Sequence, residues 1–330
     1  MKSLRIALAA SISIVSAGFS LTHSAHAVEW NAYTYAPAAT LAGARGLQTI
    51  TERVAKETNG ELKINYHLAG AVPIKTTTIT QAVAEGTMQL GDDGLYQGNI
   101  PIGGLLQLPM LLVTTEHLEI ALKIMMPYIE KAYASKGVQV IGGYYYPLQV
   151  SWSRNKLESL ADLKGQKMRV TSPEQSAFVR QFGGVPATLG AEEVPSGLDT
   201  GVISGVFTAS SGGGKIWGDL LKYSYRLGPN FFNAFIIVNK KAYDKLTPDT
   251  QVKLKNIVAD VMPWNTKTLF EEEDQVTAAL RAKGMKITEA TAADMALGAK
   301  MMEPYWKTWA EKQGPDAVEA LGKIRAAIGR

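Results

Sequence analysis

The sequence predicts an α/β protein whose helices pack on a mostly parallel or mixed β-sheet. Three observations support this class. Helical and strand-like segments alternate through most of the chain, which is the order that βαβ units produce. Glycine residues interrupt the pattern where one element gives way to the next. A chain of 330 residues can also bury a large core and is long enough for two domains.

The first residues have the pattern of an export signal. Lys2 and Arg5 precede a run of small and apolar residues over 6–19, and the segment ends in Ala25-His26-Ala27. A basic start, a short apolar run and small residues at the cleavage site predict a signal peptide over 1–27 and a periplasmic mature protein. A transmembrane anchor is the alternative, but it needs about 20 apolar residues.

The first half of the mature chain then alternates between helix and strand. Apolar residues at helical spacing predict a helix over 41–57, which ends before Gly60. Alternating residues predict a strand over 62–67. The further elements expected here are a short helix over 76–84, a short strand over 88–90, a helix over 116–134 and a strand over 137–146.

The second half continues this alternation. Expected here are a helical turn over 159–164, strands over 167–170, 201–207 and 231–238, a helix over 173–182, a mobile Gly- and Ser-rich turn over 210–214, and helices over 247–283, 291–313 and 316–328. Pro173 suits the first position of its helix. Thr291 is the expected cap of a later one. Pro263 should end or kink the longest helix near Met262, and Pro304 should kink or divide the next.

The composition favours binding over catalysis. Removing the signal leaves 32 basic and 30 acidic residues, a net charge of about +2, which argues against nucleic acid as a partner. The chain has no cysteine, which excludes thiol catalysis and thiolate metal sites. Only His67 and His117 remain in the mature chain, and we interpret both as surface or capping residues. We therefore expect no catalytic residue, metal or cofactor.

Four motifs that resemble catalytic patterns have simpler explanations. Gly212-Gly-Gly-Lys215 lacks the earlier glycine and the hydroxyl residue of a phosphate-binding loop. Ser153-Arg-Asn-Lys156 stands without the partner motifs of serine acyl-enzymes. The pairs Asp92-Asp93 and Glu192-Glu193 are expected to cap helices or face solvent. Asp92 and Asp93 could still approach a ligand, because they follow a strand.

Arg169 is the most informative single residue. It lies in the predicted strand over 167–170, between the apolar Met168 and Val170, and the strand leads into a loop. A guanidinium offers a rigid fork of donors that matches a carboxylate. A structural ion pair is the alternative role.

The run from Ser159 to Val170, Ser-Leu-Ala-Asp-Leu-Lys-Gly-Gln-Lys-Met-Arg-Val, resembles the solute receptors of tripartite ATP-independent periplasmic (TRAP) transporters. The likeness continues in the segments over 182–186, 193–205 and 238–248, and upstream over 55–63 and 82–86. The resemblance therefore covers essentially the whole mature chain in the expected order.

This resemblance implies a two-lobe periplasmic-binding-protein-like fold with mixed sheets, crossing hinge strands and a long helix that spans both lobes. The expected division places 28–147 and 233–272 in lobe I, and 148–232 and 273–330 in lobe II. The implied function is capture of a small organic carboxylate between the lobes by a monomer without cofactor. The receptor would deliver it to the small and large membrane subunits of a TRAP transporter. Arg169 would bind the carboxylate.

Other site positions follow from the same resemblance. Gln149 stands where many sialic-acid receptors of the family carry a second arginine, and Phe207-Thr208 replaces a Glu-Asn pair, which argues against sialate. Trp152, Phe207 and the tyrosines over 144–146 are candidates for covering a flat or apolar ligand body. The remaining expected cleft residues are Tyr35, Asp92, Tyr96, Gln97, Ser172 and Asn233.

The sequence leaves several alternatives open. An ABC-type receptor would have a similar architecture. A periplasmic enzyme acting on a small acid and a sensory role are further alternatives. Aromatic carboxylates, short oxo- or dicarboxylates and sugar acids all remain possible ligands.

Overall fold

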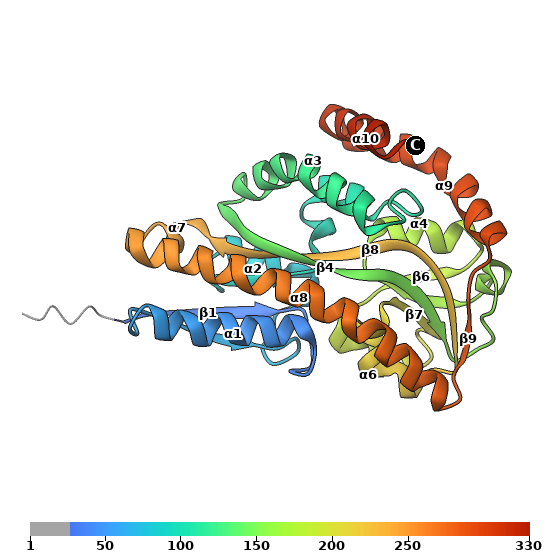
Figure 1. Cartoon of the computed structure of the whole chain (residues 1–330), viewed down its shortest axis with the longest axis horizontal. Coiled ribbons are helices and arrows are strands. Elements are labelled where there is room, and N and C mark those ends of the chain that lie inside the picture. Colours follow the sequence, from blue (N-terminus) through green and yellow to red (C-terminus); the bar gives the residue numbers. More distant parts are fainter. Residues whose placement is uncertain (1–26) are drawn as a thin grey trace, which may run out of the picture.

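A computed structural model describes residues 27–330, and the predicted signal peptide lies almost wholly outside them. The predicted α/β class with mixed strand directions is confirmed, since nine strands form one continuous sheet with helices packed around it (Figure 1). The strands are β1 Val28–Thr34, β2 Leu62–His67, β3 Leu90–Asp93, β4 Val138–Ser153, β5 Lys167–Val170, β6 Val185–Thr188, β7 Gly205–Thr208, β8 Tyr223–Asn239 and β9 Lys286–Thr288.

The helices vary widely in length. The α-helices are α1 Ala42–Glu57, α2 Ile79–Ala84, α3 Thr115–Ala134, α4 Pro173–Gln181, α5 Val194–Asp199, α6 Lys215–Trp217, α7 Lys240–Tyr243, α8 Pro248–Ala282, α9 Ala292–Gln313 and α10 Pro315–Ile328. Shorter helical turns are η1 Thr76–Thr78, η2 Tyr96–Gly98, η3 Pro101–Gln107, η4 Leu160–Leu163, η5 Ala191–Glu193, η6 Ser210–Gly214 and η7 Gly218–Leu220. Among the described residues, no helix combines the length and apolar character that a membrane span requires.

The strand order places two parallel groups on either side of two long strands. Along the sheet the order is β2-β1-β3-β8-β4-β7-β5-β6, and β9 pairs with β8. Strands β1, β2 and β3 are parallel to one another, and so are β5, β6 and β7. Strand β3 is antiparallel to β8, β8 to β4, and β4 to β7. The carboxyl ends of the two parallel groups therefore face each other across the middle of the molecule.

Strands β4 and β8 are much longer than the sequence predicts. The expected strands stop at Tyr146 and begin at Phe231, because Pro147 and Pro229 lie beyond those points. The structure continues both strands past the prolines and shifts their register at three places, including between Tyr145 and Leu148. Irregularities of this kind accommodate residues that cannot join a regular ladder.

Helix α8 runs along the length of the molecule (Figure 1), as the resemblance implies. Thr247 caps it by accepting a hydrogen bond from the Thr250 amide, at 3.2 Å. Pro263 lies inside the helix and does not end it, which leaves a kink as the alternative that the sequence predicted. Helix α1 packs along α8, and a side chain at Gly46 would collide with Asn265. Glycine at position 46 therefore permits the close approach of the two helices.

Other elements differ from the prediction in smaller ways. Strands β1, β6 and β9 were not predicted, β3 begins two residues later than expected, and Pro304 does not divide α9. The turn over 210–214 is fully buried and helical, rather than the expected mobile loop. The division into lobes stays a prediction, because β4 and β8 run through both halves of the sheet.

Candidate functional site

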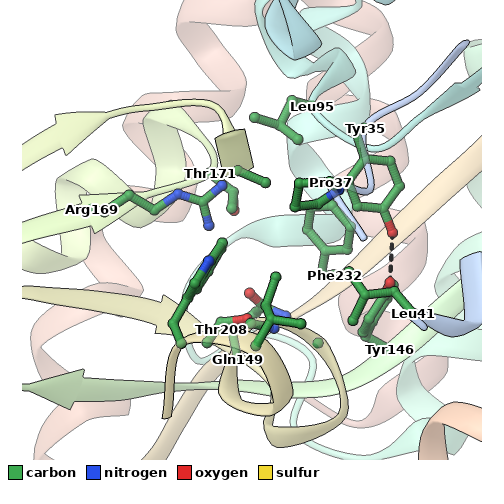
Figure 2. A pocket seen from close by; sticks show the side chains of 15 residues that line it. Tyr35, Pro37, Leu41, Leu95, Tyr146, Gln149, Arg169, Thr171, Thr208 and Phe232 are labelled. Atoms are coloured by element: carbon green, nitrogen blue, oxygen red, sulfur yellow. Dashed lines mark hydrogen bonds between the residues drawn. The ribbon is translucent and has the colours of Figure 1, made fainter. Parts of the chain in front are cut away.

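A narrow cavity lies where the two groups of parallel strands face each other (Figure 2). The volume open to the centres of water molecules is only about 40 Å³, so the cavity has room for a compact molecule at most. The lining residues are Tyr35, Pro37, Leu41, Leu95, Tyr146, Gln149, Arg169, Thr171, Ala191, Thr208, Gly212, Gly213, Ile216, Trp217 and Phe232.

Strand pairing brings the polar part of the lining together. Arg169 lies in β5, opposite Val206 of β7, and Thr208 ends β7. Val150 of β4 pairs with Thr208, so the preceding residue, Gln149, lies close to the same strand end. Side chains at the carboxyl ends of parallel strands meet at one edge of a sheet, which is where α/β proteins bind ligands. The predicted residues Arg169, Gln149 and Thr208 therefore line one wall.

Arg169 is a buried cation that forms no salt bridge in the described part of the chain, although the more distant charges of Glu192 and Glu193 raise its pKa. Its side chain extends from β5 toward Thr171 and the cavity (Figure 2), and the residue is only 3% exposed. The Nε atom donates to the Leu189 carbonyl at 3.0 Å. Neither terminal nitrogen has a hydrogen-bond acceptor in the described part of the chain, and no carboxylate there lies within salt-bridge distance. Burial lowers the pKa of Arg169 to about 10, so the group stays charged at neutral pH.

Trp217 supports this guanidinium and was missed by the sequence reasoning. The Arg169 guanidinium lies 5.5 Å from the centre of the Trp217 ring, a cation–π distance. Trp217 is the last residue of α6, which begins directly after the buried turn over 210–214. The carboxylate of Glu273 in α8 holds that turn, accepting from the Ser210 and Ser211 amides at 3.1 and 2.9 Å. No local sequence pattern predicts that an acidic residue far along the chain will hold this glycine-rich run in a buried turn.

The opposite wall is largely apolar and aromatic. Tyr35, from the loop after β1, lies 5.4 Å from Phe232 between ring centres, and Phe232 lies 5.3 Å from Tyr146. The hydroxyl oxygens of Tyr35 and Tyr146 are 2.8 Å apart (Figure 2, dashed line). Pro37 and Leu41 complete this wall. The predicted residue Tyr35 therefore lines the cavity, together with Tyr146 from the candidate aromatic run.

Asp92 and Asp93 neither cap a helix nor face solvent, so that expectation was wrong. Both lie within β3 and are almost fully buried. The hydroxyls of Thr34 and Tyr144 donate to Asp92 at 2.7 and 3.1 Å. Burial raises the pKa of each of these two aspartates to about 7. Asp92 does not line the cavity. The Tyr144 hydroxyl connects it to the lining residue Tyr35, because it lies 3.1 Å from both the Asp92 carboxyl and the Tyr35 hydroxyl.

Glu192 and Glu193 are partly and largely exposed, respectively, as expected. Glu193 accepts a hydrogen bond from the Gly190 amide at 2.7 Å and caps the turn η5. Glu192 accepts from the Thr76 hydroxyl at 3.2 Å. The two acids therefore have structural partners.

Several predicted cleft residues lie outside the lining. Trp152 is buried and donates from its indole nitrogen to the Thr208 carbonyl at 2.9 Å, and Phe207 packs against Phe178. Ser172 caps α4 by accepting from the Gln175 amide at 3.1 Å. The other three, Tyr96, Gln97 and Asn233, are also buried, and the Tyr96 hydroxyl donates to Asn233 at 2.9 Å. These six residues do not line the cavity, and ligand contact by any residue stays a prediction.

The described residues contain no cluster of three or more acidic, histidine or cysteine side chains that could hold a metal ion. His67 lies 3.3 Å from Asn31, away from the cavity, and the His117 amide donates to Thr114 at the start of α3. Both histidines therefore have the peripheral places expected of them.

The chain belongs to the family described as bacterial extracellular solute-binding protein, family 7, whose model matches residues 34–313. The predicted membership is confirmed. The 2,3-diketo-L-gulonate-binding periplasmic protein YiaO of Escherichia coli (strain K12) is 23% identical over 286 residues, covering 82% of this chain and 84% of YiaO. The protein is thus a solute receptor by family.

Solved structures of similar receptors match the fold closely. DctP6, a Bordetella pertussis extracytoplasmic solute receptor binding pyroglutamic acid, has a TM-score of 0.84 and 25% identity, covering 91% of this chain and all of DctP6. A TRAP periplasmic solute-binding protein from Desulfovibrio salexigens with bound orotic acid has a TM-score of 0.81 and 19% identity, covering 91% and 99% of the two chains.

Proposed function

We propose that the protein is a periplasmic receptor that captures a compact organic monocarboxylate, with Arg169 as the anchor of its carboxylate group. The unpaired guanidinium at the cavity wall carries this proposal. Glu192 and Glu193 act on this guanidinium only through longer-range attraction. A buried charge without a directly bonded counterion is costly, and a ligand carboxylate would supply that contact. The bond from Nε to Leu189 leaves the two terminal nitrogens as a fork, the geometry that suits a bidentate carboxylate.

The ligand is expected to carry one negative charge. Arg169 is the only charged residue among those that line the cavity. A second carboxylate would therefore be buried without a cation, which is unfavourable. This argument favours monocarboxylates over the dicarboxylates that the sequence left open.

The body of the ligand is expected to be compact and weakly polar. Apolar and aromatic side chains form most of the lining, including Leu41, Trp217 and Phe232. Gln149 has no side-chain hydrogen bond within the described part of the chain, so its amide is free to bind a ligand group. A sugar acid with many hydroxyls would leave several of them unpaired, which costs affinity. Cyclic acids such as pyroglutamate or orotate, the ligands of two similar receptors, fit this lining better.

Contacts across the cavity support a receptor that closes around its ligand. The Thr76 hydroxyl donates to Glu192 at 3.2 Å, and the Lys215 ammonium donates to the Thr40 carbonyl at 3.2 Å. Each contact joins a segment of the proposed lobe I to one of the proposed lobe II. Opening by rotation about β4 and β8 would break both contacts while preserving the sheet.

The receptor would release its ligand to the membrane subunits of a TRAP transporter and act as a monomer. It would itself perform no catalysis. Pyroglutamate incubated with the purified protein should be recovered unchanged. Conversion of the acid would instead support the periplasmic-enzyme alternative.

A thermal-shift series with pyroglutamate, orotate and 2,3-diketo-L-gulonate tests the ligand class. A ligand at 100 times its dissociation constant stabilises the folded state by about 2.7 kcal/mol. We expect a clear shift with one of the cyclic acids and a smaller one with the sugar acid. A larger shift with diketogulonate would contradict the proposed ligand body, and no shift with any of these acids would contradict the proposed ligand class.

A further inference from the structure

Three consecutive tyrosines in β4 use their hydroxyl groups differently. The Tyr144 hydroxyl donates to the carboxyl group of Asp92 at 3.1 Å, and the Tyr145 hydroxyl donates to Glu119 at 2.7 Å. For Tyr146, no group in the described part of the chain accepts the hydroxyl proton. The protein thus supplies an acceptor for the first two tyrosines and leaves the third without one.

Within the protein, the Tyr146 hydroxyl is an acceptor. The Tyr35 hydroxyl donates to it at 2.8 Å (Figure 2). A hydroxyl group has one proton to donate and can accept at its oxygen lone pairs. This bond therefore uses the proton of Tyr35 and a lone pair of Tyr146, so the proton of Tyr146 stays available. Because Tyr146 lines the cavity, a bound ligand is the expected acceptor.

Tyr146 keeps this proton at neutral pH. Burial raises its pKa well above the usual value, and the negative charges of Asp92 and Glu272 add to this effect. The Glu272 carboxylate already has two partners, since Arg45 and Lys215 form salt bridges with it at 2.7 and 3.0 Å. The Tyr146 hydroxyl is therefore a neutral hydrogen-bond donor.

Packing holds this donor in one place. The ring of Phe232 meets that of Tyr146 edge to face, with 5.3 Å between the ring centres. The backbone of Gly212 also lies against the Tyr146 ring, and a Cβ atom at position 212 would come within 3.2 Å of its Cε1 atom. A donor that is already fixed loses little conformational freedom when a ligand binds.

We propose that Tyr146 is a specificity-determining residue that donates a hydrogen bond to a carbonyl oxygen of the ligand. This inference rests on the proposed binding site and narrows its ligand class. Arg169 and Tyr146 lie on opposite sides of the cavity (Figure 2). Arg169 would bind the carboxylate, and Tyr146 would bind a ketone or amide carbonyl elsewhere on the same compact acid.

The neighbours of Tyr146 favour a carbonyl over a hydroxyl group. The side chains of Pro37, Leu41 and Phe232, which line the same wall, have no polar atom. A ligand hydroxyl that accepted from Tyr146 would find few acceptors there for its own proton, which costs affinity. A carbonyl oxygen has no proton to place. An acid without any acceptor would leave the Tyr146 proton unpaired, and sites with such buried donors discriminate against ligands of this kind.

The first test compares two monocarboxylates that differ only in a ring carbonyl. The acid 3-oxocyclopentanecarboxylate has the ring carbonyl of pyroglutamate without its N–H group, and cyclopentanecarboxylate lacks both. In calorimetric titrations, the wild type should bind the oxo acid at least about fivefold more tightly, the effect of one neutral hydrogen bond. Tyr146→Phe should bind the two acids with dissociation constants that agree within about twofold, because the donor is gone.

Tyr145→Phe is the matched control. It makes the same change at the next residue, whose hydroxyl bonds to Glu119 and does not line the cavity. This variant should keep the preference of the wild type for the oxo acid. Equal binding of both acids to the wild type, or an unchanged preference in Tyr146→Phe, would overturn the inference while leaving the proposed receptor function intact.

The second test needs no ligand. In protein labelled at the ζ-carbon of tyrosine, an equal mixture of H₂O and D₂O splits the NMR signal of a tyrosine whose hydroxyl proton exchanges slowly with the solvent. The signals are identified with Tyr35→Phe and Tyr146→Phe. The Tyr35 proton should exchange more slowly, because it is bonded within the protein. A Tyr146 proton that exchanges more slowly than that of Tyr35 would overturn the inference. If neither ring acid binds the wild type, the proposed ligand class fails, and this exchange measurement still decides whether Tyr146 has a free proton.

Discussion

In the described part of the chain four arginines lie over tryptophan rings, and Arg169 is the one among them that forms no salt bridge. Arg226 is the most useful comparison, because its ion pair is the most buried of the other three. Arg226 lies 5.7 Å from the centre of the Trp152 ring and forms a salt bridge of 2.8 Å with Glu273. Arg169 lies 5.5 Å from the Trp217 ring centre and has no carboxylate within salt-bridge distance in the described part of the chain; Glu192 and Glu193 act on it from farther away. Both guanidinium groups are therefore held in place by aromatic packing, but only that of Arg226 is neutralised by the protein.

This difference separates a structural ion pair from a binding group. Glu273 serves Arg226 and the amides of Ser210 and Ser211 at once, so it fixes the turn that carries Trp217. In the proposed complex, the ligand carboxylate would neutralise the charge of Arg169, as Glu273 neutralises that of Arg226. Changes at Arg226 should then affect stability, and changes at Arg169 should affect ligand binding.

The largest effect is expected for Arg226→Ala. Removing one partner of a largely buried pair leaves the other charge uncompensated, so the free energy of unfolding should fall by about 3 kcal/mol. Urea denaturation measures this change. A loss below about 0.5 kcal/mol would show that the pair behaves as an exposed surface contact.

Arg169→Ala should affect binding rather than folding. The loss of a charge-assisted bidentate contact should raise the dissociation constant of pyroglutamate at least tenfold. The free energy of unfolding without ligand should stay the same or rise, because a buried unpaired charge is removed. Calorimetry and urea denaturation measure the two quantities on the same protein. A strongly destabilised variant with normal affinity would reverse the roles assigned to the two arginines.

Arg169→Lys isolates the geometry from the charge. A lysine keeps the positive charge but loses the fork and the bond to the Leu189 carbonyl. We expect an intermediate dissociation constant, several-fold above that of the wild type and below that of Arg169→Ala. A dissociation constant of the lysine variant equal to that of the wild type would indicate that charge alone anchors the ligand.

The smallest effect is expected for Gln149→Ala. One neutral hydrogen bond contributes about 1 kcal/mol, so the dissociation constant of pyroglutamate should rise about fivefold. Trp152→Phe is a useful comparison, because Trp152 lies behind the wall and should change stability more than affinity. Equal affinity of Gln149→Ala and the wild type would remove Gln149 from the proposed ligand contacts.

The sequence predicts the cavity wall that contains Arg169 better than it predicts the rest of the site. Arg169 lies in a predicted strand, whereas Gln149 and Thr208 lie just beyond the predicted strands and were found only through the family resemblance. Trp217 follows a glycine-rich run whose burial depends on Glu273, more than fifty residues later, so no local pattern predicts it. Asp92 was expected to cap a helix or face solvent because the predicted strand ends at Leu90, whereas β3 continues to Asp93. The extra length of β4 and β8 was also missed. Both strands contain prolines, and the register shifts that accommodate them are visible only when the two strands are paired.

The most direct test of the central claim is a double-mutant cycle between Arg169 and the ligand carboxylate. Calorimetry would compare pyroglutamate with its neutral primary amide on the wild type and on Arg169→Ala. We predict that the amide binds the wild type at least tenfold more weakly than the acid, and that Arg169→Ala no longer distinguishes the two. Equal binding of acid and amide to the wild type, or an unchanged preference for the acid in Arg169→Ala, would contradict the assignment of Arg169 as the anchor.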